Sequence, residues 1–194
     1  TVLEQESWAN IMMKAVAAAS DRSEAMGETM GAISETRYYA GLARNIRGTM
    51  QEVLPGQMSL FHREAAGVAG IIVPWNFPVM LSIGPLITAI AAGNRAMMKM
   101  SEFTPNTNQV LRDMLGQIFA ENEVALVEGE ANIAAQFSAL PFDHILFTGS
   151  TLIGRHVMRA AAENLTPVTL ELGGKSPAII APDMPIETAV ERLI

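Results

Sequence analysis

Apolar residues near the start of the chain recur with the period of an α-helix. Six of them fall at i, i+3, i+4, i+7, i+8 and i+11, which places them on one face of an amphipathic helix. These six are Trp8, Ile11, Met12, Ala15, Val16 and Ala19. A second helix is predicted from about Glu28 to Met50, and Pro55-Gly56 then predicts a turn. A short extended segment is expected over residues 59–64, so two helices precede the first buried strand.

Further along the chain, short apolar runs alternate with helical stretches. Residues 68–73 are apolar and β-branched in part, and this run is long enough for one buried strand but short for a helix. Residues 79–92 are almost all apolar or small, which predicts a well-covered helix that Gly93-Asn94 ends. A second strand is predicted over residues 96–100. Two buried strands joined through a helix imply a parallel sheet.

The alternation continues through the rest of the chain. Thr104-Pro105 is typical of a helix N-cap followed by proline at the first helical position, and it predicts a helix to about Phe119. Strands are predicted over residues 124–127, 144–147, 168–172 and 176–180, and helices over residues 130–138, 151–161 and 186–194. This order predicts an α/β fold with an open parallel sheet, in which ligands bind beyond the carboxyl ends of the strands.

Composition narrows the function classes. Of 194 residues, 49% are hydrophobic and 17% are charged, which suffices for a packed core. The net charge of −7 comes without a basic run, so we expect no nucleic-acid or membrane partner. There is no cysteine, which excludes disulfides, thiolate metal sites and a cysteine nucleophile within these residues. No leader sequence is recognised and residues 79–92 are too short to cross a bilayer, so we expect a soluble, cytoplasmic protein.

Two polar segments follow the first two predicted strands of the sheet. Pro74-Trp75-Asn76-Phe77-Pro78 places one amide between two prolines, and this predicts a stiff turn. Lys99 and Glu102 follow the next strand and could reach the hydroxyls of a ligand. A carboxylate there would accept hydrogen bonds from a ribose diol and repel a 2′-phosphate. The alternative is a surface ion pair worth less than about 1 kcal/mol.

A glycine-containing stretch, FTGSTLIG over residues 147–154, lies at a predicted strand-to-helix junction. Free backbone N–H groups and the helix dipole favour an anion such as phosphate at that point. The stretch matches neither G-x-G-x-x-G nor a P-loop, and an ordinary glycine turn with a Ser or Thr cap is the alternative. The three histidines, His62, His144 and His156, have no spacing for a metal site or a triad, so each is interpreted as structural or exposed.

A carboxylate interrupts the apolar strand in LELGGKSP over residues 170–177. Glu171 is therefore expected in apolar surroundings that suit a general base, and the two glycines after it would let backbone approach a ligand closely. The alternatives are a glutamate on the solvent face of an edge strand or one paired with Lys175.

The four motifs PWNFP, KMSEFTP, FTGSTLIG and LELGGKSP, in this order, resemble the NAD(P)-dependent aldehyde dehydrogenase superfamily. Residues 141–177 are particularly similar to the coniferyl aldehyde dehydrogenase branch. The resemblance implies a Rossmann-type NAD-binding domain over residues 56–172, preceded by helices over 1–55 and followed by a truncated start of the next segment over 173–194. It further implies NAD-dependent oxidation of an aldehyde, either coniferyl aldehyde or another aromatic aldehyde. NADP is the alternative cofactor. The full-length protein is expected to form a homo-oligomer.

The resemblance also assigns roles to individual residues. It implies that Asn76 donates to the oxyanion formed from the aldehyde and that Glu171 is the base that activates water. The implied cofactor-binding residues are Lys99 and Glu102 at the adenosine ribose, Ser150 at the pyrophosphate, Gly149 and Gly154 in its loop, and Gly173 beside the nicotinamide.

Two departures from the family pattern are visible. Met100 stands where the family usually has proline, which is expected to loosen the strand end. The nucleophilic cysteine of the family lies beyond Ile194, and the chain corresponds to less than half of a family member, so these residues alone are expected to be inactive. A non-catalytic dinucleotide-binding or interaction module is the second hypothesis. A different oxidoreductase on the same scaffold is disfavoured because G-x-G-x-x-G and a Tyr-Lys pair are absent.

Overall fold

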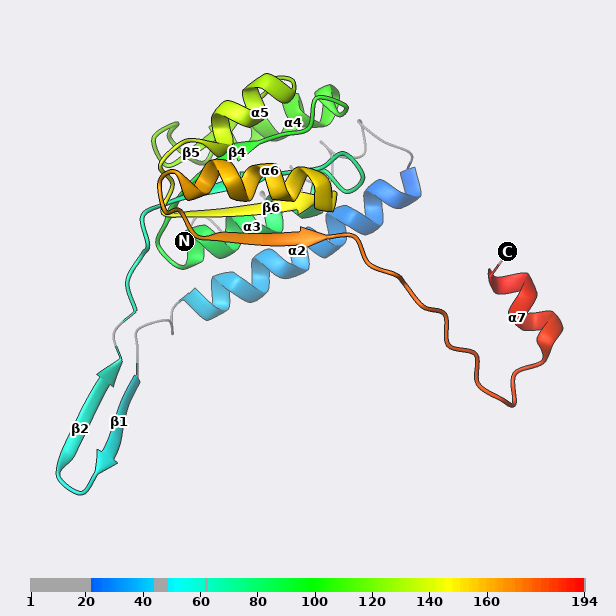
Figure 1. Cartoon of the computed structure of the whole chain (residues 1–194), viewed down its shortest axis with the longest axis horizontal. Coiled ribbons are helices and arrows are strands. Elements are labelled where there is room, and N and C mark those ends of the chain that lie inside the picture. Colours follow the sequence, from blue (N-terminus) through cyan, green and yellow to red (C-terminus); the bar gives the residue numbers. More distant parts are fainter. Residues whose placement is uncertain (1–21, 44–48, 62, 194) are drawn as a thin grey trace.

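The computed structural model of the chain describes residues 22–43, 49–61 and 63–193 (Figure 1). The predicted first helix around Trp8 lies outside this part of the chain, as does His62. None of the helices in the described ranges is long and apolar enough to cross a membrane.

The first described helix, α2 (Arg22–Ala43), ends earlier than predicted. Residues around Met50 belong instead to β1 (Thr49–Leu54), which pairs antiparallel with β2 (Gln57–Phe61). The helix prediction for Met50 is therefore wrong, because cross-strand pairing to Leu60 overrides a helical spacing of apolar residues. The predicted turn is confirmed: Gly56 adopts a φ of 79° in the two-residue connection, which glycine tolerates without a steric penalty. Figure 1 shows the hairpin projecting from the rest of the molecule.

The predicted α/β alternation is confirmed, and the strand over residues 124–127 is confirmed to the residue. The elements are β3 (Val68–Ile72), α3 (Met80–Ala91), β4 (Arg95–Lys99), α4 (Pro105–Gly116), β5 (Val124–Val127), α5 (Ala131–Ser138), β6 (His144–Gly149), α6 (Thr151–Ala162) and β7 (Val168–Leu172). The five strands form one parallel sheet in the order β5-β4-β3-β6-β7.

The strand order explains where a ligand can bind. From β3 the chain builds outward to β5, then crosses back to β6 on the other side of β3. Reversal of the order beside the central strand is the mark of a Rossmann-type sheet, and it opens a crevice at the carboxyl ends of the strands. The crevice forms because the connections on the two sides of the reversal lie over opposite faces of the sheet.

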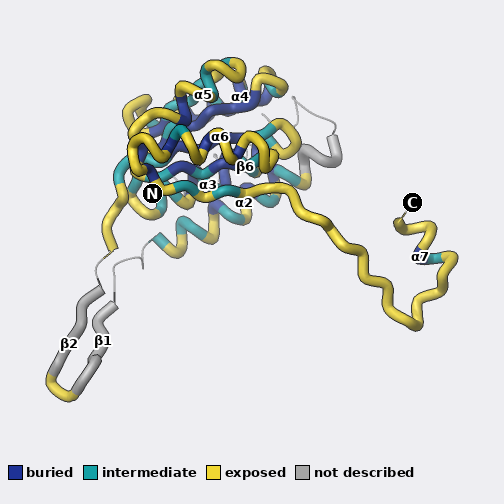
Figure 2. Tube along the Cα trace, in the orientation of Figure 1, coloured by how far each residue is buried: buried dark blue, intermediate teal, exposed yellow. Residues whose placement is uncertain are grey.

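Each face of the sheet has its own core cluster. Ile71, on one face, packs in a cluster with residues of α2, α3 and α4, while the next residue, Ile72, packs on the other face with residues of α5 and α6. Neighbouring strand residues point to opposite faces of a sheet, so the two consecutive isoleucines pack into different core clusters. Figure 2 shows that the buried positions concentrate along the sheet and the helix faces turned towards it.

The chain beyond β7 runs away from the sheet (Figures 1 and 2). The strand predicted over residues 176–180 is wrong: this segment is irregular and exposed, and Ile179 is 93% exposed. A strand needs a hydrogen-bonding partner, and none lies beside this segment within the described residues. The helix predicted next is confirmed as α7 (Ile186–Leu193).

Candidate functional site

The candidate residues gather at one edge of the sheet. Because all five strands are parallel, their carboxyl ends share an edge. Lys99 ends β4 and Gly149 ends β6, while Asn76 lies in the turn after β3 and Glu171 near the end of β7. The fold therefore brings segments that are distant in sequence to the same side of the molecule.

A cavity of about 450 Å³ lies between α5 and α6. Its floor is formed by Ile72 of β3 and Phe147 of β6, and its walls carry small or apolar side chains together with Ser138 and His156. The strand register pairs Ile72 with Lys99 of β4, so Lys99 lies on the same sheet face as the cavity floor, one strand away. A cavity of this size and lining can accept the flat face of an aromatic ring system.

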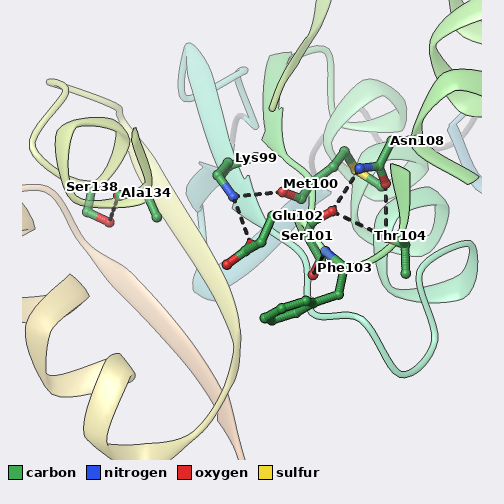
Figure 3. Close-up of polar contacts among 9 residues, drawn as sticks. All are labelled: Lys99, Met100, Ser101, Glu102, Phe103, Thr104, Asn108, Ala134 and Ser138. Atoms are coloured by element: carbon green, nitrogen blue, oxygen red, sulfur yellow. Dashed lines mark hydrogen bonds and ion pairs between the residues drawn. The ribbon is translucent and has the colours of Figure 1, made fainter. Parts of the chain in front are cut away.

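Lys99 is buried, with 3% of its side chain exposed. Its Nζ donates to the Met100 carbonyl oxygen at 2.8 Å and lies 3.6 Å from Glu102 Oε2 (Figure 3). Glu102 is more accessible, so the pair presents a carboxylate to solvent above a buried ammonium group. Because Lys99 is buried, the pair is not an ordinary surface ion pair.

Met100 strengthens the strand end, contrary to expectation. Its side chain is fully buried, and its backbone N–H donates to the Val127 carbonyl oxygen at 3.0 Å. Proline at this position has no N–H to donate. The expectation that Met100 loosens the strand end is therefore wrong, because methionine extends the ladder between β4 and β5 by one hydrogen bond.

The loop after β4 is closed by side-chain hydrogen bonds. Thr104 occupies the N-cap position of α4 as predicted, but its side chain makes no capping bond. Its hydroxyl instead lies 3.0 Å from Asn108 Oδ1, and Asn108 Nδ2 donates to the Ser101 carbonyl oxygen at 2.8 Å (Figure 3). The Phe103 N–H also bonds to Ser101 Oγ at 3.3 Å. These bonds hold the backbone on both sides of Glu102.

The sequence-based interpretation missed Ser101 and Asn108. A signal for Asn108 exists, because it precedes Leu111 and Leu115 at helical spacing on the buried face of α4. A polar residue on such a face needs a partner.

The glycine turn after β6 has a structural explanation. A Cβ on Gly149 would lie 2.6 Å from Phe147 Cζ, and one on Gly154 would lie 3.0 Å from Leu172 Cδ2. Ser150 caps α6, since its Oγ accepts from the Ile153 N–H at 3.3 Å. Packing and capping account for these three residues, which supports the ordinary-turn alternative, and a phosphate-binding role for them stays a prediction.

The turn after β3 presents Asn76 to solvent. Asn76 and its neighbours Trp75 and Phe77 are exposed, and within the described part of the chain the Asn76 amide has no hydrogen-bond partner. The backbone is anchored at each end: Val73 N–H donates to Lys99 O at 3.0 Å, and Leu81 N–H donates to Phe77 O at 3.0 Å. A side-chain donor is thus held on a fixed backbone.

Helix α3, which follows this turn, is capped from another helix. Val79 at its N-cap position has no polar side chain, and Glu28 of α2 accepts from the Met80 N–H at 2.7 Å instead. Burial raises the pKa of Glu28, against the lowering effect of hydrogen bonds from the Met80 and Val79 backbone. No local signal in the sequence indicates this contact, because its partners are 52 residues apart.

Glu171 lies on the opposite sheet face from Lys99 and the cavity floor. Leu170 packs in the cluster with α5 and α6, while Glu171 lines an open groove of about 740 Å³ beside α3. Glu171 is exposed on β7, which is an edge strand among the described residues, so the expectation of apolar surroundings is wrong. It forms no ion pair with Lys175, and both residues are described. The solvent-face alternative fits this environment.

The two glycines after β7 differ from those after β6. A Cβ on Gly173 or Gly174 would meet no heavy atom within 4 Å. Packing within the described residues therefore gives no reason for glycine at these two positions, and the space beside them is open.

Comparisons with known proteins converge on one family. The model of the Aldehyde dehydrogenase family matches residues 1–194. A probable coniferyl aldehyde dehydrogenase of Pseudomonas aeruginosa is 64% identical over 127 residues, which is 66% of this chain and 27% of that protein. The coniferyl aldehyde dehydrogenase of a Pseudomonas species is 48% identical over 73% of this chain and 30% of that protein. The chain thus matches less than a third of the length of these relatives.

Solved structures give the same result. A substrate-bound AldH of Staphylococcus aureus superposes with a TM-score of 0.86 and 34% identity, over 96% of this chain and 42% of that one. PnpE in complex with nicotinamide adenine dinucleotide superposes with a TM-score of 0.83 and 30% identity, over 98% of this chain and 41% of that one.

Proposed function

Since this chain belongs to the aldehyde dehydrogenase family, we propose that its residues form the cofactor-binding part of an enzyme that oxidises an aldehyde to a carboxylic acid. The observation that carries this proposal is that the buried Lys99, which is paired with Glu102, lies on the same sheet face as the floor of the cavity between α5 and α6. We keep the domain boundaries expected from the sequence, which place the NAD-binding domain at residues 56–172.

The residues around the cavity fit NAD. The small and apolar walls would hold the adenine ring, and the Glu102 carboxylate would accept hydrogen bonds from the ribose diol with Lys99 beside it. The same carboxylate would repel a 2′-phosphate, so we propose NAD rather than NADP. When bound, NAD supplies the acceptor for the hydride that leaves the substrate.

We propose that Asn76 and Glu171 act on the substrate. The Asn76 amide, on its anchored turn, is a donor for the oxyanion that forms at the aldehyde carbonyl. Glu171, exposed at the same edge, is accessible to a water molecule and can remove its proton. We also propose that Ser150 contacts the pyrophosphate of NAD, in the loop that contains Gly149 and Gly154. Gly173 is proposed to lie beside the nicotinamide.

The chemistry needs a thiolate that these residues lack. The 194 residues contain no cysteine, so the nucleophile is proposed to lie outside them. Without it, the chain should bind NAD and leave aldehydes unchanged.

We propose an aromatic aldehyde of the coniferyl type as substrate, on the strength of the two Pseudomonas relatives. We also propose that the whole protein assembles as a homo-oligomer. The β1–β2 hairpin supports this, because it forms a two-stranded sheet of its own and presents strand edges for pairing. A cytoplasmic location stays a prediction from the sequence.

The test is aldehyde-dependent formation of NADH by the whole protein and by its Asn76→Ala and Glu171→Gln variants, with coniferyl aldehyde as substrate. Both variants are expected to lose most of the activity while still binding NAD in calorimetry. Undiminished turnover in both variants would remove the assignment of the catalytic residues.

A non-catalytic dinucleotide-binding module is the second candidate, favoured by the absence of cysteine. It predicts saturable NAD binding by the 194 residues and no turnover in any longer form of the protein. NADH formation by the whole protein would exclude it.

A further inference from the structure

Helix α4 carries an asparagine in a place that normally suits an apolar residue. The side chain of Asn108 is 1% exposed and lies on the same helix face as the buried Leu111 and Leu115. Asparagine is a weak helix former, and a buried amide without partners is costly. Its presence at this position therefore needs a specific set of hydrogen bonds.

Asn108 meets that need by using both ends of its amide on one loop. Nδ2 donates to the Ser101 carbonyl oxygen at 2.8 Å, and Oδ1 accepts from the Thr104 hydroxyl at 3.0 Å. The Thr104 N–H bonds to the same Ser101 carbonyl oxygen at 3.4 Å. Figure 3 shows the amide reaching from α4 to the first and last residues of the four-residue loop over residues 101–104.

This loop presents Glu102. The carboxylate is accessible, and its contact with Lys99 Nζ at 3.6 Å is long for an ion pair. A contact of that length fixes the side chain only weakly, so the place of Glu102 depends chiefly on the backbone that carries it. One buried side chain, Asn108, holds that backbone directly at the Ser101 carbonyl oxygen and holds its other end through the Thr104 hydroxyl.

We propose that Asn108 is a positioning residue for Glu102, and that it thereby sets the affinity for a ribose diol and the rejection of a 2′-phosphate. The inference rests on the proposed function, in which Lys99 and Glu102 hold the ribose of NAD. A carboxylate held in place before binding meets both hydroxyls without first being ordered, and its charge stays where a 2′-phosphate would lie.

The test compares Asn108→Ala with Asn106→Ala in the whole protein, by calorimetric titration with NAD and with NADP. Asn106 is exposed on the same helix and is the matched control. Asn108→Ala is expected to weaken NAD binding by about tenfold and NADP binding by less, so the NAD preference falls several-fold. The control should keep both affinities.

A second variant covers the case in which Asn108→Ala does not fold. Thr104→Val removes the hydroxyl that bonds to Asn108 Oδ1 and keeps the shape of the side chain. It is expected to shift the NAD preference in the same direction by a smaller factor, and to speed hydrogen exchange at the Phe103 and Thr104 amides. A merely structural role would lower the melting temperature without changing the ratio of the two affinities, and that result would overturn the proposal.

Glu102→Gln separates this inference from the proposed function. If Glu102→Gln leaves both affinities unchanged, the ribose assignment itself fails. If Glu102→Gln weakens NAD binding but Asn108→Ala and Thr104→Val match the control, the ribose assignment stands and the positioning role of Asn108 is wrong.

Discussion

The loop after β4 and the turn after β3 lie at the same edge of one sheet, yet they are held in different ways. The loop is closed by the buried amide of Asn108 and is anchored by the buried Lys99 and Met100. The turn owes its stiffness to its two prolines and to backbone bonds at its ends, and it leaves Asn76 exposed. The described residues alone therefore hold the loop after β4, which is the proposed cofactor side of the site.

The proposed substrate side, around Asn76 and Glu171, is exposed within these residues. Glu171 is exposed, and a Cβ on Gly173 would meet nothing within 4 Å. Open positions beside the proposed catalytic groups are what a substrate, the proposed thiolate and the nicotinamide near Gly173 would require. We therefore expect substitutions in the loop after β4 to change cofactor binding, and substitutions at Asn76 or Glu171 to change turnover.

The largest effect is expected at the exposed Asn76, in the turn after β3. Asn76→Ala in the whole protein should lower kcat by roughly 10²–10³, because the proposed oxyanion donor is lost. NAD affinity should stay unchanged, since the loop after β4, which carries the proposed cofactor-binding residues, is held by other contacts. Steady-state assays with calorimetry measure both quantities, and Asn122→Ala, on an exposed turn before β5, is the control. A loss of NAD affinity in Asn76→Ala would break the comparison.

The next effect concerns Met100, at the buried start of the loop after β4. Met100→Pro removes the N–H bond to Val127 and a buried side chain, and should lower the free energy of unfolding by about 3 kcal/mol. Met100→Leu keeps the N–H and most of the volume, so it should cost less than about 1.5 kcal/mol. Urea unfolding measures the difference. Equal stability of the two variants would show that the ladder bond contributes little.

The glycines extend the comparison. Gly149→Ala would place a Cβ 2.6 Å from Phe147 Cζ and should destabilise the fold by about 2 kcal/mol. Gly173→Ala meets open space and should change stability by less than about 0.5 kcal/mol. Thermal unfolding gives both values. A large loss of stability in Gly173→Ala would mean that the open side is packed after all.

The smallest effect concerns the cap that Glu28 provides for α3. Glu28→Ala should cost about 1 kcal/mol through loss of the acceptor for the Met80 N–H. Burial raises the pKa of Glu28 above its ordinary value of 4.5, so the folded state binds this proton more tightly than the unfolded chain. The Glu28 contribution to stability therefore declines as pH rises through the window just above 4.5.

Glu28→Gln keeps an acceptor and removes the charge. It should remain close to the unsubstituted protein in stability and lose the decline above pH 4.5. Denaturant unfolding at a series of pH values measures this. A decline that persists in Glu28→Gln would assign it to another group.

The sequence predicted much of the sheet because its signals are local. The run over residues 68–73 has the length and composition of a buried strand, and it forms β3. The proline-flanked turn and the glycine-ended helix after it were also correctly predicted, since proline and glycine restrict their own backbones. The motif order predicted the family, which the comparisons confirm.

Errors arose where a distant partner decides the structure. Met50 pairs with Leu60 in a hairpin although its spacing from Leu42 fits a helix. Residues 176–180 have the composition of a strand, yet no strand pairs with them in the described part of the chain. Glu171 was expected in apolar surroundings because its neighbours in sequence are apolar, but alternate strand residues face opposite sides.

The sequence by itself determined the alternation of strands and helices from β3 to β7, because the periods of apolar residues reflect local geometry. It also determined which residue types can perform the chemistry, including the absence of a thiolate. Only the tertiary structure decided which groups meet: Glu28 with the start of α3, Ile72 beside Lys99, and Asn108 across the loop of Glu102. Contacts between elements depend on packing, and packing is set by the whole set of side chains rather than by any one stretch.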